Sequence, residues 1–199
     1  MSTLPEAPST ARNTAPIMDV IGPYLSEAEA LLEIASGYGE HAVHIARSYP
    51  GLVVQPSDMS DSQLEIIQAR VEGADLDNLR QPLQLNAMDD WGDVRADVVL
   101  SINMIHISPW EATLGLFRNA GRVLSGSGVL LTYGPYLCAD IDTAESNLDF
   151  DADLKRRNPE WGIRQLDALT EVAGNEGFAL EARHDCPANN FVCVFRKGG

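Results

Sequence analysis

The most constraining feature of this chain is a glycine-containing turn, Gly37-Tyr38-Gly39, which follows a short apolar run at Ala30 to Ile34. A short, continuous apolar run is typical of a buried parallel strand. Two glycines separated by one residue allow a tight turn and a close approach of the backbone to a ligand. The residues after Gly39 have helical periodicity, so we expect the N-terminus of a helix to face that ligand. The pattern predicts an α/β sheet with a ligand at the end of its first strand.

Two carboxylates accompany this turn. Asp58 ends the second expected strand, where a carboxylate can accept hydrogen bonds from ribose hydroxyls. The run Gly37-x-Gly39-x-x-Ala42 also fits a dinucleotide fingerprint, so a nicotinamide-dependent enzyme is a competing hypothesis. Glu33 favours a different ligand, because a pyrophosphate would be repelled by its charge. An acidic residue four positions before the first glycine resembles the signature of class I methyltransferases, where it helps to hold the amino acid end of S-adenosylmethionine.

The rest of the chain alternates between strand and helix patterns. We expect further strands at 52–55, 82–85, 97–102, 128–133, 180–182 and 191–195, and helices at 39–48, 61–74, 109–124 and 166–176. This order predicts an α/β, Rossmann-like class I methyltransferase fold. Its mainly parallel seven-stranded sheet would have helices on both faces and a C-terminal antiparallel strand.

The expected domain organisation is simple. Residues 1–10 are rich in Pro, Ser and Thr and are expected to form a flexible arm, and 11–199 a single domain. We expect a first helix that begins after Asn13 or Thr14 and is weakened or ended by Gly22-Pro23. The polar segment 137–164 is expected to be an irregular insertion that lines the ligand crevice.

Composition excludes several classes of function. The net charge is −15, from 14 basic and 29 acidic residues, which disfavours nucleic acid as a partner. No apolar run approaches the length of a membrane span, and the N-terminus does not have the pattern of a signal peptide. The three cysteines form no CxxC pair, and His41 and His44 lack the spacing of a zinc motif, so no metal is expected. We expect a cytoplasmic protein that acts on a small molecule, and the oligomeric state is not indicated.

Longer segments carry a closer resemblance. The relevant runs include EIASGYGEHAVHIAR at 33–47, QPSD at 55–58, INMIHISPWEAT at 102–113, TYGPY at 132–136, SNLDFDADL at 146–154, WGIR at 161–164 and PANN at 187–190. With Ala11-Arg12-Asn13, they resemble a small methyltransferase-like family known as domain of unknown function 938. The resemblance covers nearly the whole chain from Ala11. It implies a class I methyltransferase fold and S-adenosylmethionine as cofactor, but no particular substrate.

The cofactor contacts that we expect combine this resemblance with the glycine turn and the strand ends. They are Arg12, Glu33, Gly37, Tyr38, Gly39, Asp58, Met59, Asn86, Ala87 and Asn103. Arg12 is expected to reach the methionine carboxylate. Two positions depart from the family pattern: Tyr38 replaces a small Thr, and Leu85-Asn86-Ala87 replaces Leu-Asp-Val. Asn86 can still form a hydrogen bond with adenine through either end of its amide.

Four residues at strand ends are candidates for chemistry. His106 is a candidate general base because its ordinary pKa lies near neutrality, and the alternative is a packed histidine. Asn103, Tyr133 and Tyr136 could orient a substrate. We expect further substrate contacts from Asn147, Trp161, Arg164 and Asn189, with Arg164 binding a carboxylate or forming a surface ion pair.

Three hypotheses about function remain open. The leading one is methyl transfer from S-adenosylmethionine to a small metabolite. The second is intramolecular cyclisation of S-adenosylmethionine to azetidine-2-carboxylate with release of methylthioadenosine, for which Tyr38, Tyr133, Tyr136 and Trp161 could supply an aromatic lining. The third is a regulator that binds S-adenosylmethionine without catalysis.

Overall fold

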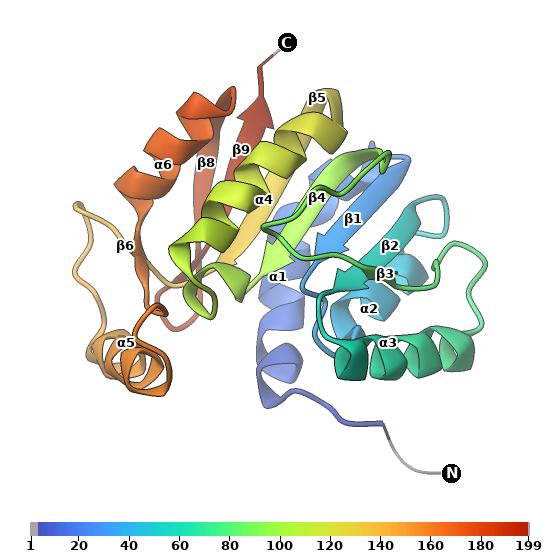
Figure 1. Ribbon diagram of the computed structural model, residues 1–199, viewed down its shortest axis with the longest axis horizontal. Coiled ribbons are helices and arrows are strands. Elements are labelled where there is room, and N and C mark those ends of the chain that lie inside the picture. The colour runs from blue at the N-terminus through green and yellow to red at the C-terminus, as the bar shows by residue number, and fades with distance from the viewer. Residues whose placement is uncertain (1–3, 199) are drawn as a thin grey trace.

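The computed structural model describes residues 4–198 and is built around a seven-stranded sheet (Figure 1). The strand order is β3-β2-β1-β4-β5-β9-β8, and β9 runs antiparallel to both of its neighbours. The strands are β1 (Ala30–Ile34), β2 (Val53–Asp58), β3 (Leu83–Gln84), β4 (Ala96–Ile102), β5 (Leu124–Gly134), β8 (Phe178–Cys186) and β9 (Asn190–Lys197). The α/β architecture expected from the sequence is therefore confirmed.

Helices cover both faces of the sheet (Figure 1). One face packs against α1 (Pro8–Ser26), α2 (Glu40–Ser48) and α3 (Asp61–Ala74), and the other against α4 (Trp110–Val123) and α6 (Leu166–Asn175). A fifth helix, α5 (Glu145–Arg157), lies at the lower edge of the sheet in Figure 1, where the parallel strands end. The order of strands reverses between β1 and β4, and in open α/β sheets ligands bind beside such a switch point.

The first helix differs from the sequence expectation. It begins at Pro8, so residues 8–10 of the expected flexible arm are helical, and it continues through Pro16 and Pro23 to Ser26. Each internal proline removes a backbone hydrogen bond. The helix persists because Ile17, Ile21 and Leu25, spaced four residues apart, are almost fully buried against the sheet. Tertiary packing thus overrides two local helix-breaking signals.

The polar insertion also differs from the expectation of an irregular segment. Its centre is the thirteen-residue helix α5, which carries ion pairs between Lys155 and Asp151 and between Arg156 and Asp153. Two short strands, β6 (Tyr136–Leu137) and β7 (Arg164–Gln165), pair in parallel and bring the ends of the insertion together. Because Leu154 is its one fully buried apolar residue, the helix has little of the periodicity that sequence analysis detects.

Within residues 4–198, no helix has both the length and the apolar character needed to cross a membrane.

Candidate functional site

The turn after β1 is built from residues in left-handed conformations. Ala35, Gly37 and Gly39 have φ values of 58°, 60° and 75°. Such angles cost an alanine free energy but suit glycine. A Cβ atom at Gly39 would also lie 3.2 Å from Cγ2 of Ile67, so this position excludes larger residues on two grounds. The glycines predicted from sequence to shape a ligand-binding turn therefore do form a tight turn.

Hydrogen bonds attach this turn to the end of β2. The backbone N–H of Ser36 donates to the carbonyl oxygen of Ser57 at 2.8 Å, and the Ser57 hydroxyl donates to the carbonyl of Glu33 at 2.7 Å. Asp58 accepts from the backbone N–H groups of Gly37 at 3.1 Å and Ser60 at 3.0 Å. The two serines were not anticipated from sequence. Together these bonds hold the ends of β1 and β2 in one fixed arrangement.

Glu33 is a buried carboxylate that lacks a full set of partners. Glu33 is only 1% exposed, and its Oε2 atom has no hydrogen-bond partner in the described part of the chain. The pKa of Glu33 is raised from 4.5 to about 7, chiefly by burial; a hydrogen bond with Ser36 opposes the shift, and the charge of Asp58 adds to it. An unpartnered buried carboxylate is costly. Its free oxygen is available to a cationic or hydrogen-bond-donating ligand.

The end of β3 supplies a polar side chain close to the same edge. Oδ1 of Asn86 accepts a hydrogen bond from the N–H of Met88 at 3.0 Å, so the amide nitrogen is the group that could donate to a ligand, although Asn86 lines neither cavity described below. The backbone at Ala87 packs closely against Gly115 on α4, where a Cβ atom would lie only 2.2 Å from the Ala87 carbonyl oxygen. Met59, directly after Asp58, is 61% exposed. These positions remain candidates for the adenine and ribose end of a cofactor.

A small cavity of about 120 Å³ lies over the glycine turn. Its lining includes Glu33, Gly37 and Tyr38 from the turn, and Ala7, Ser9 and Thr10 from the start of α1. The N-terminal segment thus lies against the residues predicted to bind a cofactor tail.

Three hydrogen bonds connect the N-terminal segment, through Arg70 and Glu40, to the glycine turn and to α2. The guanidinium of Arg70 on α3 donates to the carbonyl of Pro5 at 2.6 Å and to that of Tyr38 at 2.8 Å. The N–H of Ala7 donates to Glu40 at 3.0 Å. Arg70 therefore links the N-terminal segment directly to the glycine turn.

A larger cavity of about 480 Å³ lies beside the small one. Ser9 and Asn103 line both cavities. Asn103 follows β4 in a left-handed conformation with φ 63°, and its N–H donates to the carbonyl of Tyr133 at 2.8 Å. Other lining residues are Arg12 and Asn13 on α1, His106 on the 3-10 turn η1 (Met104–His106), Tyr133 on β5, and Asn147 and Phe150 on α5. Two compartments thus meet at Asn103.

His106 is almost fully buried beneath the larger cavity. Its Nδ1 atom has no hydrogen-bond partner among residues 4–198, and its ring lies edge-on to Phe150 with centroids 5.6 Å apart. Burial, assisted by the charge of Arg164, lowers the pKa of His106 from 6.5 to about 4. The imidazole is therefore neutral at pH 7. It can form a hydrogen bond with a ligand, but a base this weak falls short of the optimum for proton abstraction at neutral pH.

Tyr133 and Tyr136 are close together in the sequence, but their surroundings in the structure differ. Tyr133 lines the larger cavity, and burial raises its pKa to about 12. The hydroxyl of Tyr136 instead donates to Thr132 at 2.9 Å within the core on the α4 and α6 face. Tyr136 is thus a packing residue in this structure, contrary to the sequence expectation.

Three of the residues expected to contact the substrate instead form contacts within the protein. Arg164 donates to the backbone carbonyls of Ser108 at 2.8 Å and Glu160 at 2.6 Å, so its guanidinium is occupied. Trp161 lies beneath the guanidinium of Arg157, which is 5.2 Å from the ring centroid. The Asn189 side chain accepts from the N–H of Ala144 at 3.1 Å. None of the three belongs to the lining of either cavity.

Asn147 does line the larger cavity, as expected. Its amide donates to the Asn189 carbonyl at 2.9 Å and fixes α5 against the β8–β9 turn. Phe150, one helical turn further along α5, was missed because this helix was not predicted. Asn13 was also missed as a wall residue. Its side chain forms a 3.0 Å hydrogen bond with His41, and only the packing of α1 on α2 reveals this.

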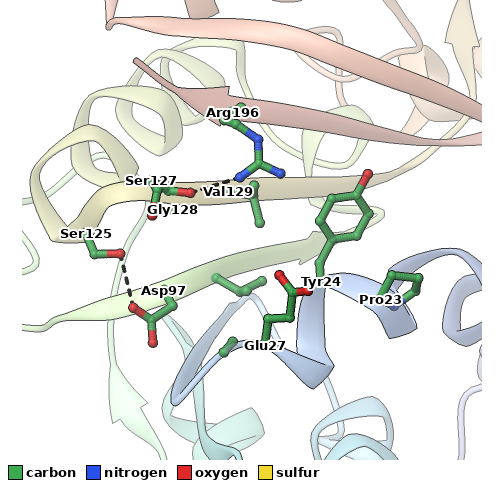
Figure 2. A pocket seen from close by; sticks show the side chains of 11 residues that line it. Pro23, Tyr24, Glu27, Asp97, Ser125, Ser127, Gly128, Val129 and Arg196 are labelled. Atoms are coloured by element: carbon green, nitrogen blue, oxygen red, sulfur yellow. Dashed lines mark hydrogen bonds between the residues drawn. The ribbon is translucent and has the colours of Figure 1, made fainter. Parts of the chain in front are cut away.

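Another cleft, of about 390 Å³, lies at the opposite edge of the sheet, where β4 and β5 begin (Figure 2). Several of its polar side chains are already paired. Asp97 accepts from the Ser125 hydroxyl at 3.1 Å and from two backbone N–H groups, and Arg196 donates to the Ser127 carbonyl at 3.0 Å and pairs with Glu181. No residue predicted to carry function lines this cleft, so the carboxyl edge is the better candidate site.

Several solved structures with the same architecture are methyltransferases. The protein superposes on an O-methyltransferase family protein from Burkholderia thailandensis with a TM-score of 0.81 and 18% identity, over 96% of this chain and 58% of that one. Mitomycin 7-O-methyltransferase gives 0.81 and 18% over 94% and 55%. The chain thus spans little more than half the length of these proteins. At such identities the likeness establishes a shared fold.

Comparison of sequences identifies the family. An uncharacterized protein of Haemophilus influenzae is 28% identical over 109 residues, which are 54% of this chain and 43% of that protein. Residues 4–197 match the family described as "Protein of unknown function (DUF938)". This chain belongs to the DUF938 family and has the Rossmann-like fold of class I methyltransferases.

Proposed function

We propose that the protein is an S-adenosylmethionine-dependent methyltransferase that acts on a small molecule. The observation that carries this proposal is the pair of cavities that meet at Asn103. One is lined by the glycine turn and Glu33, and the other, about 480 Å³, has room for an acceptor. Cavities of this size are typical of small-molecule sites.

The residues at the glycine turn fit the proposed cofactor. The free Oε2 of Glu33 can accept a hydrogen bond from the ammonium group of the methionine moiety. The Asp58 carboxylate, at the end of β2, can accept hydrogen bonds from ribose hydroxyls, and the amide nitrogen of Asn86 can donate to a ring nitrogen of adenine. When bound, S-adenosylmethionine supplies an electrophilic methyl group on a sulfonium centre.

The protein's own contribution is positioning and exclusion of water. Methyl transfer needs a nucleophile held in line, and effective molarity from positioning is a large source of rate enhancement. The neutral imidazole of His106 can orient a hydroxyl or amine by a hydrogen bond. The N-terminal segment is held by hydrogen bonds to Arg70 and Glu40 and lines the small cavity, where it can help to exclude water.

Cyclisation of the cofactor is less well supported. It would need an aromatic lining close to the sulfonium and no acceptor compartment. Of the four aromatic residues expected there, Tyr38 and Tyr133 line the cavities. The other two do not, because Tyr136 is buried in the opposite core and Trp161 lies under Arg157. The larger cavity is space that an intramolecular reaction does not use. The net charge of −15 further favours a small acceptor over a nucleic acid.

The test begins with binding. Isothermal titration calorimetry with S-adenosylmethionine, S-adenosylhomocysteine and NAD should give saturable binding for the first two ligands only. Asp58→Ala should weaken that binding at least tenfold, whereas Asp90→Asn, at an exposed surface pair, should not. Retention of full affinity by Asp58→Ala would contradict the proposed site.

Turnover then separates the remaining hypotheses. The protein is incubated with S-adenosylmethionine alone and with pooled small-molecule acceptors, and products are identified by mass spectrometry. We expect no consumption without an acceptor and release of S-adenosylhomocysteine with one. Methylthioadenosine formed from the cofactor alone would instead establish cyclisation, and tight binding without any turnover would favour a regulator.

A further inference from the structure

An exposed residue at the wall of the larger cavity carries a positive charge that is unpaired within the described part of the chain. Arg12 lines the cavity from α1 and forms no side-chain hydrogen bond or ion pair with any residue between 4 and 198. The neighbouring Asn13 is buried and bonded to His41 at 3.0 Å, so this turn of α1 has a fixed position relative to α2. A free guanidinium at a cavity wall is suited to bind a carboxylate through two parallel hydrogen bonds.

The cavity has no negative charge of its own. The chain carries 29 acidic residues, yet none of them is among the described residues that line this cavity. The other clefts differ, because Glu33 and Glu40 line the small cavity and Glu27 and Asp97 line the cleft at the opposite edge. In a protein with so many acidic residues, a cavity without acidic side chains favours a negatively charged ligand.

The other titratable side chains of the cavity do not cancel this charge. His106, with a pKa near 4, and Tyr133, with a pKa near 12, are both neutral at pH 7. Arg12 therefore gives the cavity a charge of about +1.

The remaining wall is largely apolar. Pro16, Ile107, Pro135, Phe150 and Pro187 contribute hydrocarbon surface, and Phe150 packs edge-on against His106. Such a wall favours a ligand with an apolar or aromatic body and few further polar groups.

From this arrangement we propose that the acceptor is an organic monoanion. Its carboxylate binds Arg12, its apolar body packs beside Phe150, and its hydroxyl or amine faces His106. The proposal rests on the methyltransferase function proposed above and adds the class of substrate. It also gives Arg12 a different role from the one expected from sequence, because Arg12 lines the larger cavity and not the small cavity over the glycine turn.

Matched ligand pairs test the charge preference. We would titrate 4-hydroxybenzoate and its uncharged amide, and 3-(4-hydroxyphenyl)propionate and its amide, into protein saturated with S-adenosylhomocysteine. Because Arg12 is exposed to solvent, its pair with a carboxylate is screened, and we expect the carboxylates to bind roughly three- to fivefold more tightly than the amides. Arg12→Gln should reduce this ratio to near one. Arg80→Gln, which removes an exposed charge on the connection from α3 to β3, should leave the ratio unchanged.

Several results would overturn the inference. They are equal binding of acid and amide by the unmodified protein, absence of binding by either acid, or an unchanged ratio in Arg12→Gln. A large loss of S-adenosylhomocysteine affinity in Arg12→Gln with the ratio intact would return Arg12 to the cofactor site. Failure of the unmodified protein to bind S-adenosylhomocysteine at all would instead refute the proposed function.

Discussion

Replacing Glu33 with glutamine separates the stability of this protein from its ability to bind a cofactor. The substitution keeps the shape of a side chain that is 1% exposed and removes its charge. In the folded protein the pKa of Glu33 is about 7, whereas in the unfolded chain it returns to its ordinary value of 4.5. The folded state therefore holds this proton to higher pH than the unfolded state.

The sign and size of the effect follow from that difference. Stability from this group is fully present below pH 4.5 and is lost as the pH rises through about 7. Integrated between about pH 5.5 and 8.5, the difference in proton binding corresponds to about 2 kcal/mol. His41 and His106, whose pKa values are lowered to about 4 by burial, produce the opposite trend below pH 6.5. Both histidines remain in the variant, so their contribution cancels in the comparison.

The assay is urea unfolding of both proteins at several pH values without cofactor. We expect the unfolding free energy of the unmodified protein to fall relative to Glu33→Gln by about 2 kcal/mol over this range. The same variant should bind S-adenosylmethionine at least tenfold more weakly, because the methionine ammonium loses its carboxylate partner. Glu65→Gln, at an exposed position on α3, should match the unmodified protein in both assays. Parallel pH profiles for Glu33→Gln and the unmodified protein would refute the reasoning.

Two further substitutions test the larger cavity and the N-terminal segment. In Gly134→Ala the new Cβ would lie 2.9 Å from Nδ1 of His106, so we expect the imidazole to be displaced. The variant should lose about 1–3 kcal/mol of stability and turn over more slowly, with unchanged cofactor affinity. Normal turnover would show that the position of His106 is unimportant. Arg70→Ala removes the hydrogen bonds to Pro5 and Tyr38, so limited proteolysis should cleave the N-terminal segment faster and the Kd for S-adenosylmethionine should rise several-fold; an unchanged cleavage rate would count against this tether.

Local signals were sufficient for the central part of the fold. The glycine turn, Glu33 and Asp58 lie within two consecutive βα units, and each is identified by short-range spacing. Apolar runs and helical periodicity then located the main strands and most helices, because elements buried on a sheet must present continuous apolar surface.

Local patterns gave no information where a side chain has its partners far along the chain. The guanidinium of Arg164 is a chemical group that can bind a carboxylate, but in the structure it donates to the carbonyl of Ser108, 56 residues away. Tyr133 and Tyr136 have similar sequence surroundings, and β5 ends between them at Gly134. One tyrosine lines the cavity and the other packs in the opposite core, which no short-range pattern distinguishes.

By itself, the sequence determined the class of fold, the glycine turn and the two carboxylates beside it, because these depend on backbone conformation and on residues close together in the chain. Only the tertiary structure decided which residues form the second cavity. Its walls come from α1, α5 and the β8–β9 turn, so Arg12 and Ala188 meet at one site although nearly the whole chain separates them. The charge and shape of that cavity arise from packing, and packing depends on contacts that no local pattern records.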